Sequence, residues 1–485
     1  MKTFQRLLPL LLFFGGLGYK LWYLDGRSLA NDEPFSVYHA QLALCDIIKE
    51  LTQGNNPPLY EMILHFWVKC MGISTFSVRL PSCIFSALTG IFIFLIGKKH
   101  HSIQVGIVSC LAFTFSDANL LYAHTARAYA LLVLLCCISF YLLLLFIKKP
   151  KTSLLILLAS INAIMLYTHY ISCFIYFAQL LTVLLSTHWK TTAFKHYLVS
   201  LVMMIILSSP ILVILIKQSM LSVSHGTWVE PPSGIRSIYY MLWRFFNVPL
   251  TACLFIVIII AVCIKAWWQQ KRIMLSTFSK AIIIWSSMLL VIFVLSFKIP
   301  LFMRRYVLFT SPALCILASS SIHYLFKNVP KIKLLASLLF VLIIGLSAHP
   351  NKDNDRHIRE MVAYVKETTQ NFNTNDIIIF SPTFDDIGFC YYYAPTVFQK
   401  ATTHKGIKSN IYRFFKENNI FPIQKIHEIP TDAINRCHRM IFIDGKTNDI
   451  NIETSFRDTF TLLSKRHFHE IHDVYLFAKT LDVRH

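Results

Sequence analysis

Long apolar runs, separated by short polar stretches, fill the first 350 positions of this 485-residue chain. A helix rises about 1.5 Å per residue, so roughly 20 apolar residues cross the ~30 Å hydrocarbon core of a bilayer. The runs therefore predict eleven membrane-spanning helices. They lie near residues 4–24, 76–97, 103–123, 128–147, 152–169, 171–187, 197–216, 250–267, 281–297, 307–326 and 332–348.

The pattern changes after residue 350, where shorter amphipathic and apolar segments alternate with polar ones. Helical periodicity predicts helices near 355–370 and 452–464, and apolar runs predict strands near 376–380, 439–443 and 473–479. The sequence thus predicts an α-helical polytopic membrane protein, with about eleven transmembrane helices and a small C-terminal α/β domain.

Charge separates the same two parts of the chain. Residues 1–350 hold 28 Lys/Arg and 8 Asp/Glu, whereas residues 351–485 hold 18 and 17. Only 15% of all residues are charged, against about 25% in average soluble proteins. The basic residues stand in short clusters between apolar runs rather than on one face or tail, which excludes a nucleic-acid partner.

The Lys/Arg clusters also predict the orientation in the membrane. They fall at alternate ends of the spans, and such ends are normally cytoplasmic. Eleven spans then place the N-terminus in the cytoplasm and the tail outside, in a multi-pass protein of the plasma (inner) membrane. We expect a transmembrane domain at 1–348, with a first extracytoplasmic loop at 25–75, and an extracytoplasmic domain at 349–485. No convincing cleavage site follows the first span, so we interpret it as an anchor.

The first external loop opens with two adjacent carboxylates, Asp32 and Glu33, close to the membrane boundary. A carboxylate there can act as a general base on a hydroxyl or ligate a cation. The alternative is that Asn31 or Asp32 caps a short helix with Pro34 in its first turn.

Three further motifs lie towards the same outer side. Asn55-Asn56-Pro57-Pro58-Leu59-Tyr60 precedes an apolar helical stripe, Arg127 lies in a turn between two spans, and Arg304-Arg305-Tyr306 precedes the tenth span. Paired guanidiniums suit bidentate contact with a phosphate. The alternatives are interfacial anchoring for Arg127 and a lipid headgroup contact for Arg304 and Arg305.

These motifs, together with Phe76-Ser77-Val78-Arg79-Leu80-Pro81 and Ala126-Arg127-Ala128-Tyr129-Ala130-Leu131-Leu132, resemble those of the GT-C membrane glycosyltransferases. Within that class the chain is similar to the bacterial branch related to protein O-mannosyltransferases (glycosyltransferase family 39) and to the lipid A aminoarabinose transferase. The resemblance covers residues 1–348 and is strongest in the first 150.

The resemblance implies an inverting transferase that moves a sugar from a polyprenyl-phosphate donor to an acceptor at the extracytoplasmic face, in cell-envelope glycosylation. It implies Asp32 as the general base, with Glu33 beside it in the same motif. It implies that Arg304 and Arg305 hold the donor phosphate, with Arg127 as a further phosphate candidate. Tyr306, Asn56 and Tyr60 complete the expected set of substrate-binding residues. The acceptor is a lipid, a glycan or a protein.

The chain departs from the aminoarabinose branch at one position that matters for a metal. That branch has a Glu-Lys pair before its Pro, whereas this chain has Asn55-Asn56. No cofactor is certain, although a divalent metal is possible. Four histidines near the outer face could ligate it or simply form hydrogen bonds. They are His39, His65, His124 and His169.

Two other functions stay open on sequence grounds. A secondary transporter or lipid-linked sugar flippase would fit eleven spans, but ionisable residues are almost absent from their middles. A polysaccharide polymerase or ligase would rely on a large external loop late in the chain. In the tail, Cys390 and Cys437 could form a disulfide. Tyr391-Tyr392-Tyr393 could stack on a sugar, although a buried strand is the favoured interpretation.

Overall fold

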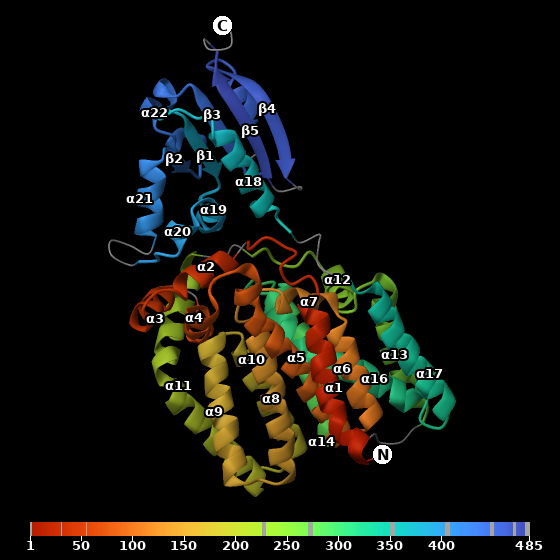
Figure 1. Ribbon diagram of the computed structural model, residues 1–485. Coiled ribbons are helices and arrows are strands. Elements are labelled where there is room, and N and C mark those ends of the chain that lie inside the picture. Colours follow the sequence, from red (N-terminus) through yellow and green to blue (C-terminus); the bar gives the residue numbers. More distant parts are fainter. Residues whose placement is uncertain are drawn as a thin grey trace. The chain divides into compact units, whose positions relative to one another are not determined.

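The computed structural model describes residues 2–30, 32–54, 56–225, 229–269, 275–349, 355–402, 408–446, 451–468 and 472–480. These residues form two compact units, each of which draws on separate parts of the chain. Unit 1 consists of Met1–Tyr23, Leu51–Tyr60 and Arg79–Asn351, and unit 2 of Leu24–Glu50, Glu61–Val78 and Lys352–His485. Figure 1 shows their elements in sequence colours.

Unit 1 is helical, and each of the eleven predicted spans coincides with helix. The elements are α1 (Lys2–Leu21), α5 (Thr75–His100), α6 (Ile103–Thr114), α7 (Asp117–Ala123), α8 (Tyr129–Lys148), α9 (Thr152–Thr168), α10 (Ser172–Ser186), α11 (Thr192–His225), α12 (Arg236–Phe245), α13 (Pro249–Trp268), α14 (Thr277–Leu295), α15 (Arg304–Val307), η1 (Leu308–Thr310), α16 (Ser311–Leu325) and α17 (Pro330–Ser347).

Seven helices in the described ranges are long and apolar enough to cross a membrane, and an eighth span results if α6 and α7, bent by 65°, count as one. The apolar helices α9 and α10 are shorter, at 17 and 15 residues. In α1, Lys20 is buried and its Nζ donates to the Thr114 carbonyl over 3.4 Å. The prediction of a polytopic helical membrane protein is confirmed.

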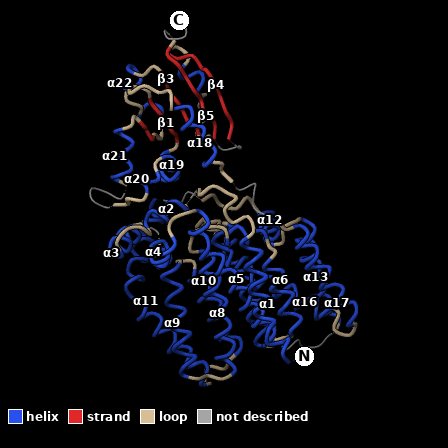
Figure 2. Tube along the Cα trace, viewed as in Figure 1, coloured by secondary structure: helices blue, strands red, loops and turns tan. Residues whose placement is uncertain are grey.

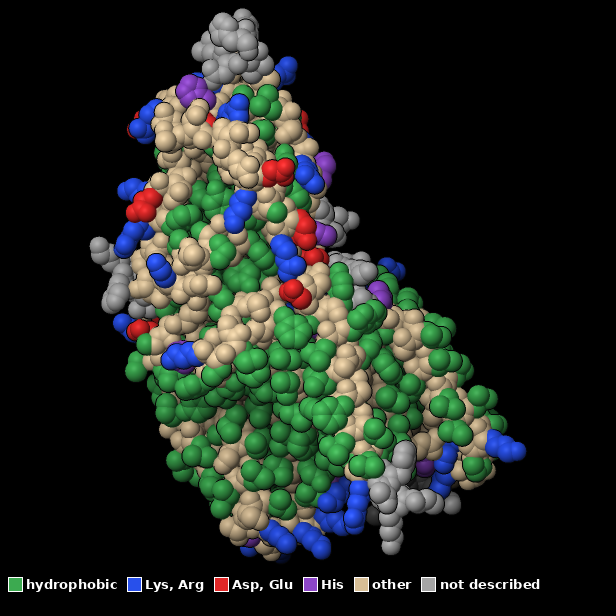
Figure 3. Space-filling view, in the orientation of Figure 1, with side chains coloured by type: hydrophobic (Ala, Val, Ile, Leu, Met, Phe, Trp, Pro, Cys, Tyr) green, Lys and Arg blue, Asp and Glu red, His purple; other side chains and the backbone are tan. Residues whose placement is uncertain are grey.

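The interior of unit 1 combines apolar packing with neutral hydrogen bonds. Ser139 donates to Asn162 Oδ1, and Gln179 Nε2 donates to the Ser139 hydroxyl over 2.7 Å; all three side chains are buried. Neutral pairs of this kind satisfy polar groups between spans without burying a charge. Figure 3 shows the apolar side chains covering the helices and the Lys and Arg side chains gathered at one end of them.

Unit 2 contains three helices of the first loop, α2 (Glu33–His39), α3 (Leu44–Gln53) and α4 (Leu59–Met71), which lie largely within it, and the tail. Figure 2 shows that the strands are confined to the tail. Its elements are α18 (Ile358–Thr369), β1 (Ile377–Ser381), η3 (Thr383–Asp385), α19 (Asp386–Tyr393), α20 (Pro395–Phe398), α21 (Ser409–Glu417), β2 (Ile420–Pro422), η4 (Ile426–Glu428), α22 (Thr431–Arg436), β3 (Arg439–Asp444), α23 (Ile452–Phe456), β4 (Phe460–Phe468) and β5 (His472–Lys479).

The five strands form one mixed sheet in the order β2-β1-β3-β5-β4. Strand β1 runs parallel to β2 and β3, whereas β5 is antiparallel to β3 and β4. Apolar side chains of β1, β3 and β5, such as Ile379, Phe442 and Phe477, form the core on one side of the sheet. The predicted small α/β domain is confirmed.

Two local predictions in the tail are wrong. The helix expected over 452–464 ends at Phe456, and the chain continues as β4. Eight residues of β4 pair with β5, and this tertiary pairing outweighs the helical periodicity of the segment. The segment Tyr391–Tyr393 belongs to helix α19 rather than to a buried strand.

Side-chain contacts within unit 2 explain why the start of the first loop packs with the tail. The Leu29 N–H donates to the Tyr392 hydroxyl over 2.5 Å, and the Ser28 N–H donates to Asp355 Oδ1 over 3.0 Å. Burial raises the pKa of the Tyr392 hydroxyl, which keeps it neutral. The Arg359 guanidinium also pairs with Asp25 over 3.2 Å. The sequence predicted that the first loop, residues 25–75, belongs to the transmembrane domain. In the structure most of this loop belongs to the same compact unit as the tail.

The closest helix contact in unit 1 yields a prediction. A Cβ on Gly97 of α5 would lie 2.6 Å from the Gly106 Cα of α6, whereas a Cβ on Gly15 of α1 would meet nothing within 4 Å. We expect Gly97→Ala to cost about 1–3 kcal/mol through overpacking. The matched Gly15→Ala should be neutral or stabilising by roughly 0.5–1 kcal/mol. Thermal unfolding in detergent compares them, and equal midpoints would contradict the close contact.

Candidate functional site

The acidic motif lies at the start of α2 in unit 2. Asp32 holds the N-cap position of α2, yet its side chain makes no capping hydrogen bond. The Asp32 side chain is exposed, whereas Glu33 in the first turn is 5% exposed. The capping alternative is therefore wrong for Asp32, and Asn31 lies outside the described residues. An exposed carboxylate at the first turn of a helix is available for chemistry.

Helix α2 is held by polar contacts of buried side chains. The Ser36 hydroxyl donates to Glu61 Oε1 over 2.6 Å, and both side chains are buried. The Tyr38 hydroxyl hydrogen-bonds Asn410, and burial raises the pKa of Tyr38 to about 12, so the hydroxyl stays protonated. The sequence around Glu61, which follows Tyr60, does not predict that the Glu61 side chain is buried against Ser36.

The predicted arginines lie in unit 1, where separate segments bring them together. Arg304 and Arg305 begin α15, and Arg127 lies in the turn between α7 and α8. Arg127 and Arg305 both act electrostatically on the imidazole of His169, which follows the last residue of α9. Arg304 and Arg305 both act on the Tyr122 hydroxyl of α7. We call Arg127, Arg304 and Arg305 the arginine cluster.

Aromatic rings line the arginine cluster. Ring centroids lie 5.2 Å apart for Tyr122 and Tyr129, 5.8 Å for Tyr129 and His169, and 5.6 Å for His169 and Tyr306. The Arg305 guanidinium lies 5.3 Å from the Tyr306 ring. Tyr122 and Tyr129 flank Arg127 in the sequence, but the contact of Tyr129 with His169 depends on the packing of α8 and α9.

Of the other two predicted substrate-binding residues, Asn56 contacts the arginine cluster, whereas Tyr60 has a structural contact. The Arg127 Nη2 group donates to Asn56 Oδ1 over 3.2 Å, so Asn56 belongs with the arginine cluster. Tyr60 is 1% exposed and its hydroxyl hydrogen-bonds Ser82 over 3.2 Å, a contact that fixes a helix. Asn55 lies outside the described residues.

Electrostatics favour an anion beside the arginine cluster. Unit 1 contains two acidic residues, Asp117 and Glu230, and Asp117 accepts from the His349 imidazole over 3.2 Å. Arg304 makes no ion pair within the described ranges. Three guanidiniums thus share one region in a unit that has few carboxylates, and a phosphate is the group that bidentate guanidiniums bind best.

The four histidines considered as metal ligands are all hydrogen-bonded to the backbone. The contacts are His39 Nδ1 to the Phe35 carbonyl, His65 Nδ1 to the Ala40 carbonyl, His124 Nε2 to the Lys20 carbonyl, and the Ile171 N–H to His169 Nδ1. These contacts account for their positions without a metal.

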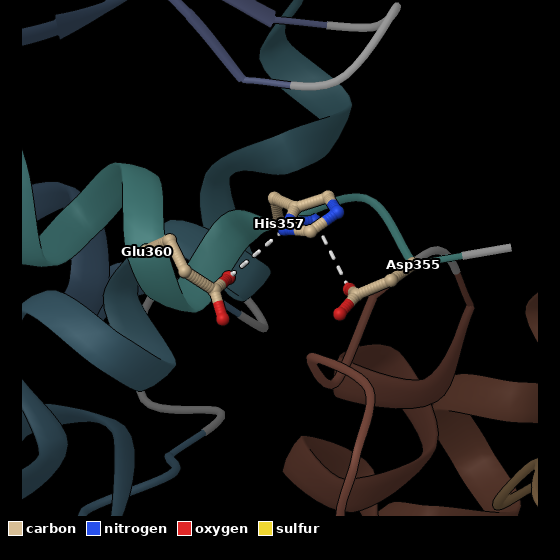
Figure 4. A group of neighbouring side chains, drawn as sticks. All are labelled: Asp355, His357 and Glu360. Atoms are coloured by element: carbon tan, nitrogen blue, oxygen red, sulfur yellow. Dashed lines mark hydrogen bonds and ion pairs between the residues drawn. The ribbon is translucent and has the colours of Figure 1, made fainter. Parts of the chain in front are cut away.

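Another group in unit 2 has the geometry for a cation. Ligand atoms of Asp355, His357 and Glu360 lie within 4.8 Å of one another. Figure 4 shows the His357 ring between the two carboxylates. Asp355 accepts from the His357 N–H over 3.0 Å, and His357 Nδ1 lies 3.7 Å from Glu360 Oε2. The Asp355 carboxylate thus accepts from the backbone of His357, and the His357 and Glu360 side chains approach each other at the start of α18.

The two cysteines of the tail are free thiols. Burial raises the pKa of Cys390 to about 12 and that of Cys437 to about 11. Cys437 packs among apolar side chains of the tail core, as a small hydrophobic residue does.

Residues 55–214 match the family model described as dolichyl-phosphate-mannose-protein mannosyltransferase, which covers about a third of the chain. Among solved structures, ArnT from Cupriavidus metallidurans in the apo state matches with a TM-score of 0.60 and 11% identity. The match covers 96% of this chain and 97% of that chain. ArnT bound to undecaprenyl phosphate matches with a TM-score of 0.59 and the same identity and coverage. No curated protein sequence matches the chain.

The class of protein follows from these matches and the fold. The chain is a multi-pass membrane protein with the fold of ArnT over nearly its whole length. The sequence match to mannosyltransferases and this fold confirm the resemblance to the GT-C membrane glycosyltransferases.

The contact between α2 and α4 yields a prediction. Ser36→Ala leaves the buried Glu61 carboxylate without the hydroxyl that donates to it, which should cost about 1–3 kcal/mol of unfolding free energy. The control is Ser455→Ala, since Ser455 is exposed and donates to a backbone carbonyl. Thermal unfolding of the full-length protein in detergent measures both. Midpoints within error of each other would show that the Ser36 contact contributes no stability.

Proposed function

We propose that this protein is an integral membrane glycosyltransferase that moves a sugar from a polyprenyl-phosphate donor to an acceptor, with inversion. The observation that carries the proposal is the arginine cluster at one end of the helical unit with the ArnT fold. ArnT, the structural neighbour, binds undecaprenyl phosphate. The acceptor is a lipid, a glycan or a protein.

The arginine cluster would hold the donor phosphate. Arg304 and Arg305 offer two guanidiniums in successive positions, and Arg127, held by Asn56, adds a third. A polyprenyl-phosphate donor leaves as a phosphate, and positive charge fixed beside the departing oxygens stabilises the transition state. Tyr306 and Tyr122 supply aromatic walls for the donor.

Asp32 would act as the general base. The acceptor hydroxyl attacks the anomeric carbon opposite the phosphate, and its proton passes to the Asp32 carboxylate. The new glycosidic C–O bond forms as the bond from the anomeric carbon to the phosphate oxygen breaks, so the configuration inverts. Glu33 is buried beside Asp32 and would position it.

The orientation of the chain belongs to the same proposal. Helix α8 begins just after Arg127 and ends at Lys148, and α16 follows Arg305 and ends just before Lys327. The arginine cluster and the lysines therefore lie at opposite ends of unit 1. By the positive-inside rule the lysines face the cytoplasm, so the reaction takes place at the extracytoplasmic face.

Asp32→Asn tests the base. An Asn caps a helix as well as an Asp, but it cannot take a proton at neutral pH. We expect transfer from a radiolabelled polyprenyl-phosphate sugar to fall about 100-fold to 10,000-fold, the usual contribution of a general base. Asp46→Asn, in α3, serves as the control and should keep its activity. Full activity of Asp32→Asn would remove Asp32 from this role.

Alanine substitutions of Arg304 and Arg305 test the donor phosphate site. Each should weaken binding of undecaprenyl phosphate about 10-fold to 100-fold, which corresponds to one charged hydrogen bond. Arg305→Lys should recover part of the loss, because an ammonium keeps the charge without the bidentate geometry. Arg236→Ala, at the exposed start of α12, is the matched control. If Arg304→Ala, Arg305→Ala and Arg305→Lys all bind undecaprenyl phosphate as the wild type does, these arginines contact lipid headgroups instead.

A further inference from the structure

A cavity lies at the lysine end of unit 1, away from the arginine cluster. It has a volume of about 610 Å³, and its lining comes from the ends of α5, α8 and α10 and the starts of α11 and α14. Cavities of roughly 300–1,000 Å³ are typical of small-molecule sites. The proposed glycosyl transfer makes no use of this cavity.

The polar lining of the cavity consists of donors and contains no carboxylate. It includes Lys148, His100, His188 and the hydroxyls of Ser186, Thr187, Thr191, Thr192 and Thr277. No Asp or Glu occurs between Asp117 and Glu230 or between Glu230 and residue 350. Lys149, Lys151 and Lys190 stand close in sequence to the lining residues, so the surroundings are positive as well.

Two buried polar atoms in this lining lack a partner. Within the described ranges, neither His100 Nε2 nor Ser186 Oγ has a hydrogen bond. A buried polar atom without a partner costs about 1–3 kcal/mol, so such atoms normally meet water or a ligand. The His100 ring is held against Phe278, with ring planes 6° apart.

The protein also presents donors in a fixed arrangement. His188 Nδ1 accepts from the Lys190 N–H over 3.3 Å, so a neutral ring carries its proton on Nε2, as a donor. Thr191 caps α11 by accepting from the Phe194 N–H over 3.3 Å. The first N–H groups of this 34-residue helix, at Thr192 and Ala193, have no acceptor within the helix, and such groups bind anions.

We propose that this cavity binds a phosphate group, with Lys148, His188, Ser186 and the first N–H groups of α11 as its ligands. Charge, hydroxyl donors and a helix N-terminus together select a phosphate over a neutral or cationic ligand. The group comes either from the headgroup of an anionic phospholipid or from a soluble phosphate compound. The site is separate from the donor site and does not depend on the proposed function.

The test uses the full-length protein in phosphatidylcholine nanodiscs. One arm titrates inorganic phosphate and follows the unfolding midpoint; the other adds phosphatidylglycerol and counts retained lipids by native mass spectrometry. Lys148→Glu should weaken binding at least about tenfold, the factor for one charged hydrogen bond. Lys149→Glu is the matched control, since Lys149 is exposed, adjacent and absent from the lining.

The two arms identify the source of the phosphate. If inorganic phosphate raises the unfolding midpoint and Lys148→Glu removes this effect, the ligand is a soluble phosphate compound. If Lys148→Glu lowers only the retention of phosphatidylglycerol, the ligand is a lipid headgroup. Thr192→Pro, which removes one N–H at a position where proline is tolerated in a helix, should weaken the same binding. Equal behaviour of Lys148→Glu and Lys149→Glu in both arms would overturn the proposal.

Discussion

A charge inside a bilayer is stable only beside a partner or at the water boundary, and this constraint organises unit 1. The deep layers rely on neutral groups such as the Ser139, Asn162 and Gln179 network. The arginine cluster lies at one end of α8 and α16, and Lys148 and Lys327 lie at the other. In the proposed function the arginine cluster is a preformed anion site, which costs little reorganisation when a phosphate arrives.

The distribution of carboxylates then decides where acid–base chemistry can take place. Unit 1 has two acidic residues, and the other 23 belong to unit 2. The proposed phosphate clamp belongs to unit 1, and the proposed proton acceptor, Asp32, belongs to unit 2. The burial of Glu33 and Glu61 within unit 2 keeps α2 in place and leaves Asp32, at its first turn, exposed.

Most of the helical architecture could be predicted because a span needs only a long apolar run, and all eleven runs are helical. The predictions failed where tertiary pairing decides. The segment after Phe456 joins β4, and Tyr391–Tyr393 lies in α19. In the candidate site the arginines carry a sequence signal. Their contacts with His169 and Tyr122 depend on how separate helices pack, and no local pattern encodes that.

The most direct test of this account is the distance between Asp32 and the arginine cluster. Spin labels at Asp32→Cys and Arg304→Cys, in a background with the exposed cysteines replaced, allow it to be measured by pulsed electron resonance. The reacting hydroxyl and anomeric carbon must approach within about 3.5 Å, so the labels should lie within roughly 20 Å of each other. A single population well beyond 40 Å would contradict the account.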